Sequence, residues 1–357
     1  MPYKDTLLTK KLSLEFPIIQ APMAGGPTTP ELISCVSNFG GLGSLGAGYM
    51  KPAVLDVAIK LIKEKTEKAF AVNLFIPTHA EAYPSNLEAM LKVLKPYADD
   101  LGVTLPLPTK PFVPNFDEQM HIILDHKIKV FSFTFGILEP SWVKTLKNEN
   151  VTIIGTATSH LEALELEKSG VDFIVCQGKE AGGHRGTFIG DAKESLVPVF
   201  SLTEACSKHV NIPIISSGGI MHGEDIIKSL KHGAAAAQMG TAFLTTDESG
   251  CSDEYKDMLL RQKHDETTLT KAFSGKYARA IKNTFIEEMQ PHEEEFLEYP
   301  IQHVLTKPLR DKAENLGRID IMSLWAGQRA FLCKKLPCKK LLEKLAHECE
   351  QHKHLLD

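Results

Sequence analysis

The chain has 357 residues, of which 43% are hydrophobic and 24% are charged, as in a globular protein rather than a disordered or fibrous one. Its formal charge of −5 is mild, so we expect neither nucleic acid nor an anionic membrane as a partner. The sequence shows neither an apolar run of the ~20 residues that span a bilayer nor an N-terminal secretory signal, which predicts a cytoplasmic protein.

Short apolar, β-branched runs alternate with stretches of helical periodicity over the first 245 residues. This alternation is typical of βαβ units and a parallel sheet. The predicted strands are 17–23, 41–45, 69–75, 130–135, 152–158, 173–177, 213–217 and 236–241. Eight strand–helix units in this length predict a (β/α)₈ TIM barrel, and a doubly wound open sheet is the alternative.

Three of the intervening helices have clear ends. Thr29 followed by Pro30 is a capping residue before proline at the first helical position, which predicts a helix start. The helices predicted at 159–169 and 223–232 are each followed directly by glycine, a common helix terminator.

Two segments depart from the alternation. Residues 77–120 are rich in proline, and so long a connection predicts an active-site cover or a helical excursion. Residues 246–316 are charged and predicted to form a small, mainly helical cap domain. From Gly317 the apolar period of Ile319, Met322, Trp325 and Ala326 predicts a terminal helix that packs back on the barrel. We therefore expect a barrel of residues 1–245 and 317–357, with a substrate-binding cap of residues 246–316.

The loop 177–186, Gln-Gly-Lys-Glu-Ala-Gly-Gly-His-Arg-Gly, directly follows a predicted buried strand. In a barrel this position lies on the catalytic rim, where glycines let the backbone approach a ligand closely. His184 is the candidate catalytic residue, because histidine can donate or accept a proton near neutral pH. The bland alternative is a glycine turn with an exposed histidine.

Small residues end the last two predicted strands, as Ser216-Ser-Gly-Gly-Ile220 and Gln238-Met-Gly-Thr241. Barrels frequently bind a phosphate with the loops after strands seven and eight. Tight helix–strand packing would also select glycine there. Neither a Walker sequence nor a dinucleotide fingerprint is present, so the phosphate is expected to belong to a mononucleotide or a sugar phosphate.

Polar residues end two other apolar strands. The amides of Asn73 and Gln177 offer both donors and an acceptor, which suits the edge of a heteroaromatic ring. Met23 would give that ring a soft, polarizable face. Alone, Asn73 is more often a satisfied core amide.

Together these segments resemble a known family, the nitronate monooxygenases, formerly called 2-nitropropane dioxygenases, and in particular their class I branch. The resemblance spans nearly the whole chain and rests on Gln20-Ala-Pro-Met-Ala-Gly-Gly, Asn73-Leu-Phe, Glu180-Ala-Gly-Gly-His-Arg-Gly, Ser217-Gly-Gly-Ile, Gln238-Met-Gly-Thr and Leu324-Trp-Ala-Gly-Gln. It implies an FMN-dependent barrel that oxidises alkyl nitronates with O₂, with propionate 3-nitronate as the expected substrate. The implied products are an aldehyde or semialdehyde plus nitrite and nitrate, and the enzyme is expected to be a monomer or homodimer.

The resemblance also assigns site residues. His184 matches the active-site histidine. The positions matching FMN contacts are Met23, Asn73, Gln177, Gly182, Gly218, Gly219, Gln238, Met239, Gly240, Thr241, Ala326, Gly327 and Gln328. In the substrate region Tyr299 and Lys307 match, and Lys307 is a candidate counter-charge for a substrate carboxylate. His303 stands where a second tyrosine is usual, and Thr134 where some members carry histidine, so both bear on specificity.

Several alternatives remain at the level of sequence. An FMN-dependent enoyl-acyl-carrier-protein reductase shares the glycine–histidine loop, and it would use NAD(P)H. A phosphosugar isomerase or lyase would need no flavin, and a non-catalytic flavin carrier would not react with nitronates. The seven cysteines have no disulfide-framework spacing, and the Cys333–Cys338 spacing is unusual for structural zinc, so no metal is expected.

Overall fold

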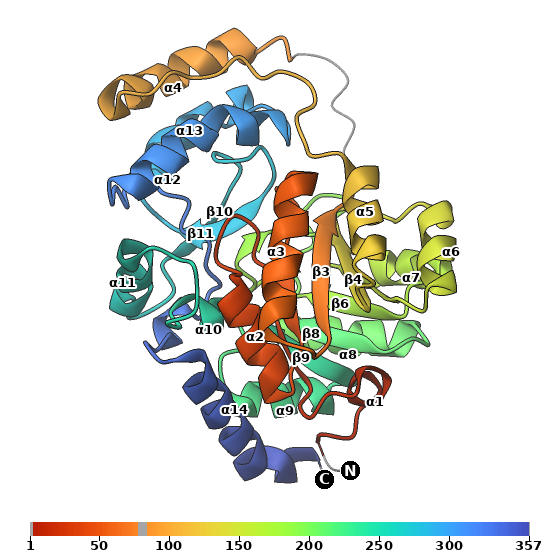
Figure 1. The fold of residues 1–357 in the computed structure, drawn as a ribbon. Helices are drawn as coiled ribbons and strands as arrows, with labels where there is room; N and C mark the ends of the chain where they lie inside the picture. The colour runs from red at the N-terminus through yellow and green to blue at the C-terminus, as the bar shows by residue number, and fades with distance from the viewer. Residues whose placement is uncertain (1–2, 78–83, 357) are drawn as a thin grey trace.

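The structure, a computed structural model, describes residues 3–77 and 84–356. Its main feature is an eight-stranded parallel sheet in the order β1-β9-β8-β6-β5-β4-β3-β2. A parallel bridge between Ile19 and Leu42 joins the two outer strands, and helices surround the sheet (Figure 1). The predicted TIM barrel is therefore confirmed, and the open-sheet alternative is wrong.

The eight strands of the barrel overlap all eight predicted runs. They are Ile18–Gln20 (β1), Gly43–Gly46 (β2), Phe70–Phe75 (β3), Val130–Thr134 (β4), Thr152–Ala157 (β5), Phe173–Gln177 (β6), Ile214–Ser217 (β8) and Ala234–Met239 (β9). Their residues are buried almost throughout, because helices cover the outer face of the sheet and side chains fill its interior.

The helices around the barrel begin and end where the sequence signals lie. Thr29 accepts a hydrogen bond from the Leu32 amide, and Ser159 accepts one from the Glu162 amide, which satisfies a free donor at each helix start. These helices are Leu7–Leu12 (α1), Pro30–Phe39 (α2), Pro52–Lys65 (α3), Phe116–Asp125 (α5), Pro140–Asn148 (α6), His160–Ser169 (α7), Val199–His209 (α8), Gly223–Lys231 (α9) and Thr241–Leu244 (α10).

The proline-rich segment forms a helical excursion, as predicted. Its helix α4 (Leu87–Leu101) lies across α13 (Ile301–Asn315), far from the barrel strands (Figure 1). Residues 78–83 of this segment lie outside the described residues. The excursion therefore packs on the elements that follow the last barrel strand.

Residues 246–316 contain helices and a small sheet. The helical elements are α11 (Asp253–Arg261), α12 (Thr284–Met289), the 3₁₀ helix η1 (Gln290–Glu295) and α13. The strands β10 (Thr267–Thr270) and β11 (Ala278–Ile281) form a hairpin, and β11 pairs with β7 (Gly183–His184). Part of the loop that carries the candidate histidine thus forms the third strand of this second sheet.

The prediction of a helix running through Ile319, Met322, Trp325 and Ala326 is wrong. These residues form turns and an isolated bridge between Trp325 and Ala280 of β11. Their spacing matches a helical stripe, but the segment is held by contacts of Trp325 with β11 and with Tyr255 of α11. The terminal helix begins later, as α14 (Cys338–His352), after the short η2 (Ala330–Leu332), and it packs on α2 and α9 as expected of a terminal helix; η3 (Lys353–Leu356) follows it. None of the helices in the described part of the chain is long and apolar enough to cross a membrane.

Candidate active site

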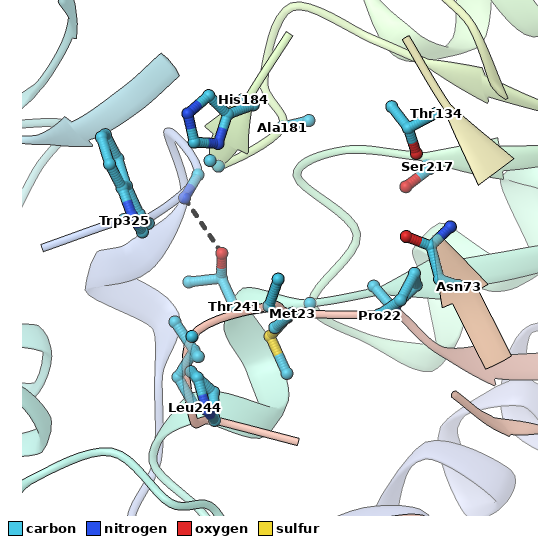
Figure 2. Close-up of a pocket in the computed structure, with 18 of the residues that line it drawn as sticks. Pro22, Met23, Asn73, Thr134, Ala181, His184, Ser217, Thr241, Leu244 and Trp325 are labelled. Atoms are coloured by element: carbon cyan, nitrogen blue, oxygen red, sulfur yellow. Dashed lines mark hydrogen bonds between the residues drawn. The ribbon is translucent and has the colours of Figure 1, made fainter. Parts of the chain in front are cut away.

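A cavity of about 300 Å³ lies at the carboxyl ends of the barrel strands, within the size range of ligand pockets. Figure 2 shows Asn73, Thr134 and Ser217 on one side of it, His184 and Trp325 on the other, and Met23 between them. The predicted site residues that line it are Met23, Asn73, Thr134, Gln177, Gly182, His184, Gly218, Gly219, Gln238, Met239, Gly240, Thr241, His303, Lys307 and Gly327. Residues as far apart in the sequence as Met23 and Gly327 thus line one cavity.

The His184 loop is held by buried polar groups beneath it. The Gln177 side-chain amide donates to the His184 carbonyl (3.0 Å) and accepts from the Gly186 amide (2.8 Å). Arg185 is fully buried, and its guanidinium donates to the carbonyls of Gly178, Gln177 and Ser195. Each end of the Gln177 amide therefore makes one hydrogen bond to the loop, and its contact with a ring edge stays a prediction.

Glu162 anchors the chain just after the His184 loop. Its fully buried carboxylate accepts hydrogen bonds from the amides of Phe188 (2.5 Å) and Ile189 (2.9 Å) and from Thr158. Hydrogen bonds to an ionised carboxylate are stronger than neutral ones. The loop is consequently fixed on both sides of His184.

His184 is a neutral imidazole in this environment. Burial, and after it the positive charges of Lys276 and Arg310, together lower its pKa to about 3. Its Nε2 lies 2.8 Å from the hydroxyl of Ser274, in the turn between β10 and β11. A group that carries no charge of its own in a positive electrostatic potential is well placed to receive an anion.

The glycine loops after β8 and β9, the seventh and eighth strands of the barrel, meet at one end of the cavity. Gly218 and Gly219 have φ values of +122° and +65°, which favour glycine. The backbone amides of Gly219 and Gly240 donate no hydrogen bond to another described residue, and both residues line the cavity. Free amides at the rim of a barrel suit a phosphate group.

Arg329 adds a positive charge at this end of the cavity, and the sequence analysis missed it. Its Nη1 donates to the Gly219 carbonyl (2.9 Å) and to the Asp225 carboxylate (2.7 Å). Asp225 also accepts from the amides of Met221 and His222, so the pair fixes the loop after β8. Arg329 follows Gln328 directly, but nothing in its local sequence indicates a contact with Gly219.

Two strand ends supply polar groups at the wider part of the cavity. Asn73 of β3 donates to the hydroxyl of Ser132 in β4 (3.0 Å), which leaves the carbonyl of the Asn73 amide for a ligand. Thr134 ends β4, and the residue after it, Phe135, has a φ of +81°. A positive φ at a bulky residue is unusual and is often found at functional sites.

One face of α13 forms the outer side of the cavity. His303, Lys307 and Arg310 lie three or four residues apart, so they share that face. The ring of His303 stacks on Tyr49, with centroids 4.2 Å apart and an interplanar angle of 11°. Tyr49, Arg310 and Trp325 line the cavity without having been predicted to do so.

Three predicted site residues do not line the cavity. Ala326 is fully buried with its amide bonded to the Arg279 carbonyl, and the Gln328 side chain points to Asp265 at 2.9 Å. Tyr299 packs behind His184, with ring centroids 6.3 Å apart. Between Ala326 and Gln328, Gly327 does reach the cavity and donates to the Thr241 hydroxyl at 3.0 Å (Figure 2).

These features define a barrel enzyme whose rim cavity is lined by two glycine loops and by a histidine in a positive electrostatic potential. The sequence model of the family described as nitronate monooxygenase matches residues 5–348. The chain therefore belongs to the nitronate monooxygenase family, a flavin-dependent family, and is an oxidoreductase.

Individual relatives agree with this assignment. A probable nitronate monooxygenase of Staphylococcus aureus (strain MRSA252) is 41% identical over 345 residues, which cover 96% of this chain and 97% of the relative. The solved nitroalkane oxidase of Streptomyces ansochromogenes has 36% identity and a TM-score of 0.91, covering 98% of this chain and 99% of that one. FabK of Thermotoga maritima is less similar, with 29% identity, a TM-score of 0.78 and 98% coverage of each chain.

Proposed function

We propose that this enzyme binds FMN and oxidises an alkyl nitronate with O₂, with propionate 3-nitronate as its substrate. The expected products are malonate semialdehyde, nitrite and nitrate. The observation that carries the proposal is that His184 and the two glycine loops line the same cavity. Family membership and the match to a nitroalkane oxidase support the same reaction class.

The residues at the cavity fit FMN. The phosphate would lie against the amides of Gly219 and Gly240, where a hypothetical Cβ on Gly240 would make ordinary contacts with Ala21 (3.5 Å) and Met23 (3.6 Å). Asn73 and Thr134 would hold the polar edge of the ring system, and Met23 would lie against it. When bound, a flavin accepts electrons from the substrate and passes them to oxygen, and the protein supplies orientation and electrostatics.

The charges around His184 favour an anionic substrate. Lys276 and Arg310 both act on His184 as positive charges, so an anion at this position is stabilised relative to a neutral nitroalkane. A nitronate is already a carbanion equivalent and needs little help from an acid or a base. His184 is proposed to orient its nitro group.

Ser274 sets which nitrogen of His184 carries the proton. Its single hydroxyl proton can go to His184 Nε2 (2.8 Å) or to the Lys276 carbonyl (3.1 Å). The first arrangement puts the imidazole proton on Nδ1, where it can donate to a nitronate oxygen. The second leaves Nδ1 unprotonated, where it can accept a proton from a neutral nitroalkane.

The proposal is tested by purifying the protein and looking for bound flavin by its absorbance. Propionate 3-nitronate is then added without oxygen. We expect the flavin absorbance to bleach and to return on admission of air, with nitrite released. Steady oxidation of NADH driven by an enoyl thioester, with no response to nitronate, would instead indicate a reductase like the FabK relative. A colourless protein that does not bind added FMN would contradict the proposal outright.

A further inference from the structure

Arg310 is a cation inside the cavity whose charge no carboxylate neutralises directly. Its Nη2 donates to the His303 side chain (Nδ1, 3.2 Å) and backbone carbonyl (3.0 Å), and its Nε donates to the Thr306 hydroxyl (3.3 Å). These partners are all neutral, since burial holds the pKa of His303 well below its usual value. Within the described residues, Arg310 makes no ion pair, and its Nη1 has no hydrogen-bond partner.

The nearby acidic side chains do not neutralise the charge of Arg310. Asp311 pairs with Lys307, and both side chains are 54% exposed. Glu314 also lines the cavity, and its pKa is raised, first by burial and then by Asp311, so its ionised form is disfavoured. Lys307 is therefore exposed and ion-paired, whereas Arg310 is partly buried and makes no ion pair with a described residue.

Tyr49 supplies a second unused donor at the same place. Its ring stacks on His303, the residue that also holds Arg310. Its hydroxyl is buried and makes no hydrogen bond of ordinary length among residues 3–77 and 84–356, although the Tyr299 hydroxyl is close enough to act on its pKa. A buried hydroxyl without a partner is costly, which indicates that a ligand supplies the missing acceptor.

We propose that Arg310, oriented by His303 and assisted by the Tyr49 hydroxyl, receives an acidic group at the far end of the substrate. The enzyme would thereby select nitronates that carry a carboxylate. This inference rests on the proposed function and names the specificity residues of that site. It assigns the carboxylate to Arg310 rather than to the ion-paired Lys307, and it gives His303 a positioning role.

The test compares two nitronates on the FMN-loaded enzyme. Propionate 3-nitronate carries the carboxylate, and propyl-1-nitronate has a methyl group in its place. We expect Arg310→Gln to raise KM for propionate 3-nitronate at least about tenfold, the loss of a charge-assisted hydrogen bond, with little change in kcat. KM for propyl-1-nitronate should rise by a clearly smaller factor, since the methyl group makes no such bond and only the longer-range effect of the Arg310 charge on the nitronate group is lost.

Two further variants sharpen the assignment. Tyr49→Phe removes only the hydroxyl and should raise KM for propionate 3-nitronate alone, by a smaller factor. Arg310→Lys keeps the charge but loses the planar guanidinium. Its KM for propionate 3-nitronate should lie between those of wild type and Arg310→Gln. Arg261→Gln, an exposed arginine of α11 that does not line the cavity, is the matched control.

The outcomes separate the two proposals. A wild-type enzyme that oxidises neither nitronate would overturn the proposed function, and this inference with it. If Arg310→Gln raises KM for both nitronates by the same factor, or melts at a much lower temperature than wild type, Arg310 has a structural role and the inference is wrong. If Lys307→Gln produces the selective loss and Arg310→Gln does not, the carboxylate belongs to Lys307.

Discussion

His184 lines the cavity and has a strongly lowered pKa, which makes it the first residue to test. It lies on a loop fixed by Gln177 and Arg185, and its imidazole is neutral. We expect His184→Asn to retain FMN, because the phosphate cradle lies on other loops. Turnover of nitronate should fall at least about tenfold, equivalent to ~1.4 kcal/mol of barrier. Flavin content by absorbance is the control, and unchanged steady-state kinetics would remove His184 from the mechanism.

The neutral state of His184 also makes stability depend on pH. In the unfolded chain a histidine titrates near 6.5, whereas the folded pKa is about 3. Below pH 6.5 the unfolded state therefore binds a proton that the folded state does not, so this contribution to stability is lost as the pH falls from 6.5 toward 3. At pH 5 the loss is about 2 kcal/mol.

This effect can be measured by urea unfolding of the flavin-free protein between pH 7.5 and pH 5. His184→Gln cannot take up the proton, so its stability should fall less over this range than that of wild type. Parallel curves for the two proteins would show that His184 is already charged or exposed in the folded state. Because the pKa of His303 is also lowered, some pH dependence of stability should remain in the variant.

At the scale of elements, the loop after β9 gives a test of the phosphate cradle. Gly240 has φ −106° and ψ −72°, which alanine can adopt, and a Cβ there would lie 3.5 Å from the nearest side chain. Gly240→Ala should therefore fold normally. Its methyl group would lie against Ala21 and Met23, beside the amide proposed to bind the phosphate, so we expect FMN affinity to fall at least about tenfold.

Fluorescence titration of the flavin-free protein with FMN measures this loss. The control is the melting temperature without FMN, which should match that of wild type. Wild-type affinity in Gly240→Ala would place the phosphate elsewhere. A similar loss with riboflavin, which lacks the phosphate, would mean that the substitution disturbs the ring site instead.

Elements that are specified by neighbouring residues in the sequence could be predicted. The barrel strands are continuous apolar runs because both faces are covered, and the start of α2 is set by Thr29 and Pro30. The segment around Met322 and Trp325 was misread, because its apolar residues are buried by β11 and α11 rather than by one another. Periodicity carries no information about which neighbour buries a residue.

The same limit explains the missed parts of the cavity. Tyr49 follows β2, Arg310 belongs to α13, and Arg329 lies 90 residues after the end of the last barrel strand, β9. Each acquires its role only through packing with a distant element. The glycine loops and His184 were found because their signal is local: small residues directly after buried strands. Gln177 lay where it was predicted, but its partners belong to a loop whose path the sequence did not show.

At the scale of the whole molecule, the proposed barrel and cap share structure rather than meeting at a simple interface. The His184 loop provides β7 to the sheet of the cap. The segment after Gly317 returns across β11, where the Ile281 amide donates to the Leu324 carbonyl. The active site is thus built where chain segments cross between the two parts, and its geometry depends on both being folded.

One continuous hydrophobic cluster joins the two parts. Phe273 and Leu305 from the cap belong to the same cluster as Leu32 and Met239 from the barrel. Phe273 is fully buried, stacked on Phe285 and in edge contact with Trp325. A barrel and a cap with separate cores would unfold in two steps, but a shared core predicts one cooperative transition.

Calorimetry of the flavin-free protein should accordingly show a single peak whose calorimetric and van't Hoff enthalpies agree. Phe273→Ala, in the middle of the cap, should destabilise the entire transition by about 3–5 kcal/mol, because it leaves a cavity in the shared core. The far-UV signal, which reports mainly the barrel, should shift with it. Leu316→Ala, at an exposed leucine, is the matched control. A barrel that melts at its wild-type temperature after the cap has unfolded would mean that the two cores are independent, and that the His184 loop can lose its partner strand without loss of the barrel.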